Sequence, residues 1–144
     1  MIAIASDHAG VALKAELYRQ LQDRGVEVED LGPSDATSVD YPDYAHLLAR
    51  AVADGRIERG ILICGTGIGM SMAANRHPAV RAALCHDAYT AEMARRHNDA
   101  NVLCIGERTI GVGVAGQVVQ VFVDTPFEGG RHQRRVAKIE WEEP

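Results

Sequence analysis

The sequence is short of cysteine, of net positive charge and of long hydrophobic runs. Its three cysteines are an odd number and widely spaced, which argues against a disulfide framework and indicates reduced thiols. The formal net charge of -5 provides no basic field to attract nucleic acid or an anionic membrane. No apolar run approaches the roughly 20 residues that span a bilayer, and residues 1–5 lack the basic flank and long apolar core of a signal peptide. We therefore expect a cytoplasmic protein without nucleic-acid or membrane partners.

Internal repeats, low-complexity tracts and linkers are also missing, so we expect one domain over 1–144. Short apolar runs alternate with amphipathic segments about five times, which is typical of a parallel sheet with helices on both faces. Strands are expected at 2–5, 26–31, 60–64, 80–85 and 102–106. Helices are expected around Leu13–Leu21, at 44–53 and 69–75, after Asp87 to Arg96, and at 112–123, with a helix-compatible tail at 131–141.

A glycine-rich loop, Gly65-Thr66-Gly67-Ile68-Gly69, follows the third expected strand, and Cys64 stands at its mouth. A strand, a tight loop and a helix in this order point backbone N–H groups and the positive end of a helix dipole at one place. The positive electrostatic potential at that place binds anions and stabilises a thiolate. Cys64 is thus a candidate nucleophile or proton-transfer base. The alternative is a tight turn whose glycines only permit close packing.

The spacing around this loop argues against three familiar anion sites. A cysteine phosphatase needs an arginine six positions after the cysteine, where this chain has Met70. A Walker A loop needs Gly-Lys-Ser/Thr, but Met70-Ser71 stands there. A dinucleotide-binding loop normally follows the first strand with a different glycine spacing, although Asp87 lies about where a ribose-binding acid is found.

Several polar residues follow the ends of expected strands, at the edge where parallel sheets bind ligands. Asp7 and His8 follow the first strand. Either both line a site, or Asp7 caps a helix and His8 is exposed to solvent. Near the end of the chain, Arg131 and Arg135 are four residues apart and share a helix face. Such a pair suits a phosphate monoester, or else it is a solvated basic face.

The remaining cysteines and a second group of basic residues carry less chemistry by spacing alone. Arg95-Arg96-His97-Asn98-Asp99 is typical of a helix C-terminus, where cations are favoured by the dipole. Cys85 and Cys104 are expected to be buried strand residues, and with His46 and His86 they lack the spacing of metal ligands. We therefore expect neither a metal nor another cofactor.

Five motifs, taken in order, make the chain resemble ribose-5-phosphate isomerase type B, in a wider family with the galactose-6-phosphate isomerase subunits. They are Ser6-Asp7-His8-Ala9-Gly10, Asp40-Tyr41-Pro42, Cys64-Gly65-Thr66-Gly67-Ile68-Gly69, His97-Asn98-Asp99-Ala100-Asn101-Val102-Leu103 and Glu128-Gly129-Gly130-Arg131-His132. The resemblance implies an α/β fold, a Rossmann-like three-layer sandwich with a five-stranded parallel sheet and a C-terminal helix. It also implies a homodimer or tetramer with shared active sites.

The resemblance further implies a role for each matching residue. Cys64 matches the base that moves a proton between C2 and C1 of the open-chain sugar, and Thr66 a hydroxyl that assists proton movement between the sugar oxygens. The amides of Gly65, Gly67, Ile68 and Gly69 match an anion hole for an enediolate. His97 matches the residue that opens the furanose ring. The remaining matches are the sugar contacts Asp7, Tyr41 and Asn98 and the phosphate ligands His8, Arg131 and Arg135, to which Arg108 is added.

The chemistry of this reaction agrees with the residues. Removing a weakly acidic proton next to a carbonyl needs a base with a pKa near the working pH, which a thiolate at a helix N-terminus supplies. We expect interconversion of ribose 5-phosphate and ribulose 5-phosphate. The alternatives are the same chemistry on allose or galactose 6-phosphate, a sugar-phosphate-binding module without catalysis, and the disfavoured phosphatase.

Overall fold

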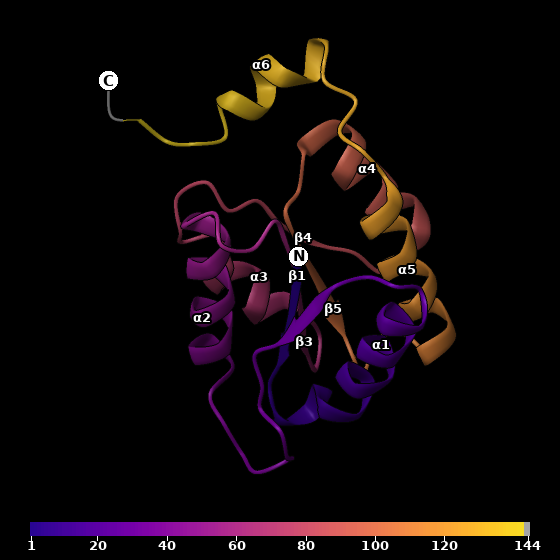
Figure 1. Cartoon of the computed structure of the whole chain (residues 1–144). Coiled ribbons are helices and arrows are strands. Elements are labelled where there is room, and N and C mark those ends of the chain that lie inside the picture. The colour runs from indigo at the N-terminus through magenta and orange to yellow at the C-terminus, as the bar shows by residue number, and fades with distance from the viewer. Residues whose placement is uncertain (143–144) are drawn as a thin grey trace.

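The computed structural model describes residues 1–142 and contains a five-stranded, fully parallel sheet (Figure 1). Its strands are β1 (Ile2–Ser6), β2 (Val28–Asp30), β3 (Arg59–Cys64), β4 (Ala82–Leu84) and β5 (Val102–Gly106). They lie in the order β2-β1-β3-β5-β4, so β3 is central. The α/β fold predicted from the alternating pattern is confirmed. Positions 143 and 144 of the expected single domain lie outside the described residues.

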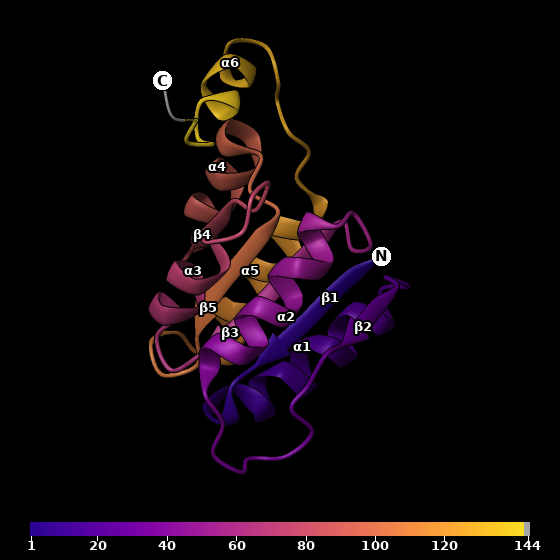
Figure 2. The same ribbon diagram turned by 90° about the vertical axis from the view of Figure 1, so that its left-hand side faces the viewer.

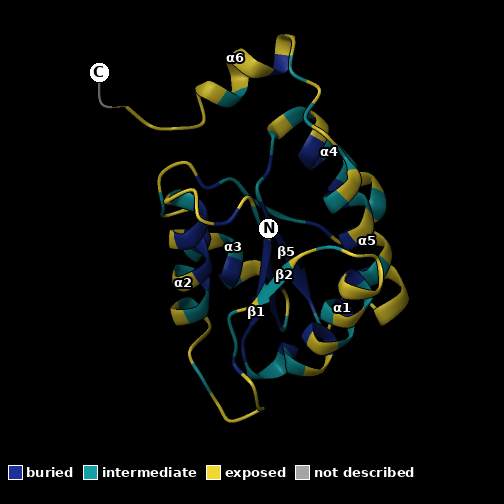
Figure 3. Cartoon of the chain, in the orientation of Figure 1, coloured by how far each residue is buried: buried dark blue, intermediate teal, exposed yellow. Residues whose placement is uncertain are grey.

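Helices cover both faces of the sheet and complete a three-layer sandwich (Figure 2). They are η1 (His8–Gly10), α1 (Val11–Asp23), α2 (Tyr41–Ala53), α3 (Ile68–Ala74), α4 (Ala88–Asn98), α5 (Val112–Asp124) and α6 (Arg131–Ala137). One core cluster joins the sheet to α1, α4 and α5, and a second joins its other face to α2 and α3. The central strands are buried while most of α6 is exposed (Figure 3). No helix within residues 1–142 is long and apolar enough to cross a membrane.

The edge strands and some helix ends differ from the sequence prediction. The outer strands β2 and β4 are shorter than expected and only partly buried, because each pairs with one neighbour. Helix α2 begins at Tyr41 rather than at residue 44, since Pro42 is compatible with the first helical turn. The last helix ends at Ala137, before the expected end of the tail at Trp141.

Helix α4 runs from one edge of the sheet to the opposite edge. The carboxyl ends of the parallel strands meet at one edge of the sheet, and the loops after β1, β3 and β5 lie there. Helix α4 follows β4 and precedes β5, so it begins at this carboxyl edge and ends at the opposite, amino edge. Helix α6 packs on α4, and in Figures 1 and 2 it lies at the top while η1 lies at the bottom.

Candidate active site

Cys64 is the last residue of β3, and its thiol is held by the loop that follows it. The side chain is buried, with 5% of the residue exposed. The Gly67 N–H donates a hydrogen bond to Cys64 Sγ at 3.1 Å. Gly67 has a φ of 78°, and a Cβ added there would lie 2.7 Å from Leu84 Cδ1 and 2.9 Å from the carbonyl carbon of Ile105. Glycine is therefore required for the turn that aims this amide at the sulfur.

Two side chains from other elements flank the same loop. Tyr41, the first residue of α2, lies over Gly69, where an added Cβ would come within 2.5 Å of its ring. The Arg108 N–H donates to the Gly65 carbonyl at 3.0 Å. The Arg108 guanidinium runs along the loop, 3.5 Å from where a Gly65 Cβ would stand.

The loop also presents an exposed hydroxyl. Thr66 is exposed, and its Oγ1 accepts a hydrogen bond from the Ile68 N–H at 3.2 Å. This contact leaves the hydroxyl proton of Thr66 available to a ligand.

Asp7 and His8 stand beside this loop at the end of β1. The Asp7 N–H donates to the Ile63 carbonyl at 3.0 Å, which ties it to the residue before Cys64. Asp7 Oδ1 accepts from the N–H groups of Ala9 and Gly10 at 2.9 and 3.3 Å, so the helix-cap alternative is correct for this oxygen. His8 is half-buried, and its Nδ1 lies 3.2 Å from the Val39 nitrogen and 3.3 Å from the Val39 oxygen. Its Nε2 is thereby the nitrogen left to a ligand.

The other two thiols belong to the core, as the sequence predicts. Cys85 and Cys104 are both buried. Burial raises the pKa of Cys85 to about 11 and that of Cys104 well above its ordinary value, so both stay protonated near neutral pH. Neither of these two thiols is therefore available as a thiolate.

A second group of polar residues gathers where α4 ends. His97 is half-buried, and its ring stacks on that of His132 in α6, with centroids 4.2 Å apart and planes 12° apart. His132 is 5% exposed, and its Nε2 lies 3.7 Å from Glu128 Oε1. Burial, followed by the neighbouring His97, lowers the pKa of His132. Asn98 is exposed beside this stack and lines a cavity of about 390 Å³.

The residues His97, Glu128 and His132 have ligand atoms within 4.8 Å of one another. The two imidazoles are nearly parallel, so their nitrogen lone pairs lie in nearly parallel planes and do not converge on one ion. A shared metal would require one ring to rotate.

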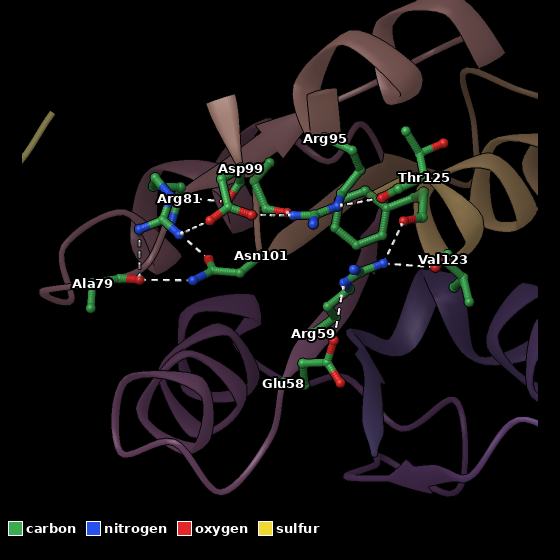
Figure 4. Close-up of polar contacts among 11 residues, drawn as sticks. Glu58, Arg59, Ala79, Arg81, Arg95, Asp99, Asn101, Val123 and Thr125 are labelled. Atoms are coloured by element: carbon green, nitrogen blue, oxygen red, sulfur yellow. Dashed lines mark hydrogen bonds and ion pairs between the residues drawn. The ribbon is translucent and has the colours of Figure 1, made fainter. Parts of the chain in front are cut away.

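A buried arginine fixes the end of α4 (Figure 4). Arg95 is 4% exposed and donates to Asp99 Oδ1 at 3.0 Å, to the Thr125 carbonyl at 3.1 Å and to the Ala100 carbonyl. Arg81 contacts Asp99 from the other side. Arg95 lies in the last turn of α4, as its spacing predicts, but it is buried there rather than exposed to solvent. It anchors the turn next to His97, and no sequence signal distinguishes it from Arg96.

Arg131 and Arg135 are exposed on α6, four residues apart as expected. His132 stands next to Arg131 but faces α4 and is buried. The sequence pattern around His132 predicts no role for this residue. Its position between the two arginines, off their shared face, is the signal that could have placed it against another helix.

One copy of the chain brings together only part of the expected site. The carboxyl edge holds one group, which comprises Asp7, His8, Tyr41, Cys64, Thr66, Arg108 and the loop glycines with Ile68. The amino edge holds the other, which comprises His97, Asn98, Arg131 and Arg135. The two groups lie at opposite ends of the strands, so the length of the strands separates them (Figure 1).

Comparison with known proteins shows the family of this chain. The model of the family described as Ribose/Galactose Isomerase matches residues 2–139. Ribose-5-phosphate isomerase B of Escherichia coli is 47% identical, over 96% of this chain and 93% of its own. D-erythrulose-4-phosphate isomerase of Pectobacterium atrosepticum is 44% identical, over 96% and 91%.

Solved structures of similar proteins share the fold at high identity. Ribose-5-phosphate isomerase B of Clostridium thermocellum superposes with a TM-score of 0.94 at 50% identity, covering 96% of this chain and 93% of that one. The enzyme of Mycoplasma genitalium, solved with bound ribulose 5-phosphate, gives a TM-score of 0.92 at 46% identity, covering 96% and 92%.

Proposed function

Because the chain belongs to the ribose/galactose isomerase family, we propose that this isomerase interconverts ribose 5-phosphate and ribulose 5-phosphate through an enediolate. The observation that carries the proposal is the Gly67 amide donating to the buried Cys64 thiol at the end of the central strand. A hydrogen bond from a backbone N–H favours the charged form of the acceptor, and a thiolate can serve as the base that removes a proton from carbon.

In this proposal Cys64 moves the proton between C2 and C1. Negative charge then develops on the two sugar oxygens, and N–H groups of the Gly65–Gly69 loop other than those of Gly67 and Ile68, which are already bonded to Cys64 and Thr66, donate hydrogen bonds to it. The hydroxyl of Thr66, which faces solvent, carries the proton between those oxygens. Asp7 and Tyr41 flank the loop and contact the sugar.

His97, Asn98, Arg131 and Arg135 reach the reaction from a second copy of the chain. Their place at the amino edge of their own copy supports this assignment, because no change of side-chain conformation would bring them to Cys64 at the carboxyl edge of the same copy. Exposed apolar side chains on the packed helices α2 and α3 also support a dimer; they are Tyr41, Leu47, Ile68 and Met72. His97 of the second copy opens the furanose ring, and Arg131 and Arg135 bind the phosphate with His8 and Arg108.

Isotope incorporation tests the reaction. Ribose 5-phosphate is incubated with the protein in deuterated water and followed by NMR. We expect ribulose 5-phosphate with deuterium at C1, at least in part, because a thiol exchanges its proton with solvent. Release of inorganic phosphate instead would establish a phosphatase, and binding without turnover of any sugar phosphate would establish a binding module.

The identity of the sugar is tested on a panel. The Pectobacterium relative is named as an isomerase of a four-carbon sugar phosphate. The names of similar proteins thus include sugars of more than one chain length. Ribose, allose, galactose and erythrulose phosphates are compared by kcat/KM. We expect ribose 5-phosphate to be preferred, and a higher kcat/KM on a hexose phosphate would replace it.

Mixing two inactive variants tests the shared site. Cys64→Ala and His97→Ala should each lose turnover as homodimers. A mixed dimer contains one site with both residues intact, so random exchange of subunits should restore about a quarter of the wild-type rate. No recovery in a mixture whose subunits have exchanged would mean that Cys64 and His97 act within one copy or not together.

A further inference from the structure

The outer face of α6 carries more positive charge than the proposed phosphate contact needs. Arg131, Arg134, Arg135 and Lys138 are spaced at i, i+3, i+4 and i+7, which places them along one side of the helix. All are exposed, while His132 on another side is buried against α4. Within residues 1–142 none of these four cations forms an ion pair.

A phosphate monoester carries up to about two negative charges at neutral pH. Arg131 and Arg135 balance that charge, and Arg134 and Lys138 are left without a counter-charge, with Arg134 lying between the two phosphate-binding arginines in the sequence. The chain as a whole is acidic, with a net charge of -5. An acidic patch on a second copy that receives this helix would pair favourably with the Arg134 guanidinium.

Such a surface lies at the start of α2. A pocket of about 510 Å³ is lined by Val39, Asp40, Asp43, Tyr44 and Leu47. Asp40 occupies the N-cap position of α2 in an extended conformation, yet its carboxylate accepts no hydrogen bond from the first turn. An aspartate at this position usually does. Asp43 is exposed in that turn, and within residues 1–142 neither carboxylate forms an ion pair.

The same pocket borders the proposed phosphate position. Its residue Val39 contacts the Nδ1 of His8, and the neighbouring Tyr41 lies over Gly69 of the loop. A helix that brings Arg131 and Arg135 to a phosphate beside His8 therefore passes close to Asp40 and Asp43.

We propose that Arg134 of one copy pairs with the carboxylates of Asp40 and Asp43 of a second copy, so that α6 docks along the start of α2. The inference rests on the proposed function, which sets α6 of the second copy beside His8. Arg134 acts as a docking residue. It touches no substrate, and it holds α6 in the position from which Arg131 and Arg135 reach the phosphate.

A charge-reversal cycle tests the pair. Arg134→Glu, Asp43→Arg and the double variant are compared by sedimentation for dimer dissociation and by steady-state kinetics. Each single reversal should weaken the dimer about tenfold or more, since like charges then meet across the interface. KM should rise more than kcat falls. The double variant should recover most of both losses, because it restores opposite charges.

Gln133→Glu is the control for position, because it places a glutamate on α6 at an exposed site off the arginine face and makes the helix one charge unit more negative. It should leave the dimer and KM near wild type. Arg134→Gln, which removes the charge without reversing it, should show a smaller loss in the same direction.

Losses that simply add in the double variant, or a dimer unaffected by Arg134→Glu, would overturn the ion pair. The dissociation constant is measured without substrate, so the result does not depend on turnover. If the double variant recovers dimer stability but the wild-type protein isomerises no sugar phosphate, the proposed function alone is overturned. If the wild-type protein is active but the double variant recovers no dimer stability, the ion pair alone is overturned.

Discussion

The imidazole rings of His97 and His132 lie stacked, 4.2 Å apart between centroids and 12° from parallel, and they join the end of α4 to α6. The stack unites the residue proposed to open the sugar ring with the helix proposed to hold the phosphate. The buried Nε2 of His132 has no hydrogen-bond partner in residues 1–142. The shape of the ring, more than its nitrogen, is therefore what His132 contributes to this contact.

Replacing His132 should separate ring shape from ring polarity. His132→Ala removes the stacking surface and should lower kcat/KM on ribose 5-phosphate about tenfold or more through misplacement of His97. His132→Phe keeps an aromatic face and removes an unsatisfied buried nitrogen, so it should retain most of the activity.

The choice of substrate is the readout that a general loss of stability would not move. Erythrose 4-phosphate carries its phosphate on the oxygen that would close a furanose, so it has no furanose ring to open, and His132→Ala should lower kcat/KM for this aldose less than for ribose 5-phosphate. Equal losses on both sugars, or a Phe variant as poor as the Ala variant, would contradict the positioning of His97 by His132.

Gly67→Ala should damage both stability and catalysis. A side chain at φ 78° is strained, and its Cβ would meet Leu84 and the backbone of Ile105. We expect a loss of about 2 kcal/mol or more in the free energy of unfolding, measured with urea. The turn can relieve the contact only by moving the amide away from Cys64, so kcat should also fall.

Gly113→Ala is the control for this substitution. Gly113 lies in the first turn of α5, and nothing stands within 4 Å of its missing Cβ. Alanine there should stabilise the helix by up to about 1 kcal/mol and leave kcat unchanged. A Gly67→Ala protein as stable and active as Gly113→Ala would refute the assignment of Gly67.

The ion pair of Lys14 and Asp30 predicts an asymmetric response to mutation. The Lys14 side chain is 3% exposed and that of Asp30 is 39% exposed, with Nζ 2.7 Å from Oδ2. Asp30→Ala leaves a buried ammonium without its partner and should cost about 3 kcal/mol in unfolding free energy. Lys14→Met fills the same space and leaves a carboxylate that water reaches, so it should cost less. Chemical denaturation of both variants checks the order, and the reverse order would be inconsistent with this burial.

The paired histidines of α2 and the loop after α3 predict a loss of stability in acid. His46 Nδ1 lies 2.8 Å from His77 Nε2. Burial, then the nearby His46 and Arg50, lower the pKa of His77 from its ordinary value of 6.5, while Asp54 acts in the opposite direction. Below 6.5 the unfolded chain therefore binds more protons than the folded one, and the unfolding free energy falls as the pH falls.

Urea unfolding at pH values from 7.5 to about 5 measures this dependence. His77→Gln removes the titrating group and should make the decline shallower over that interval. A decline of the same steepness in His77→Gln would show that other groups cause it.

Much of the carboxyl-edge site is accessible from the sequence because it is local. Cys64 and the loop after it are contiguous, and the glycines at 65, 67 and 69 signal a tight turn before a helix. Alternating apolar runs also predict the parallel sheet, and parallel strands place Asp7 and Cys64 at one edge by topology. Each of these conclusions depends on neighbours along the chain or on the common direction of the strands.

The sequence by itself thus determined the sheet, the thiol at the glycine loop and the family resemblance. Only the tertiary structure decided that His97 and the α6 arginines stand at the opposite edge from Cys64, that Arg95 is buried while Arg96 is exposed, and that the Asp40 carboxylate leaves its own helix uncapped. The physical reason is that these facts depend on where a helix ends and what packs on it. Contacts between residues distant in the chain set both, and a local pattern does not encode them.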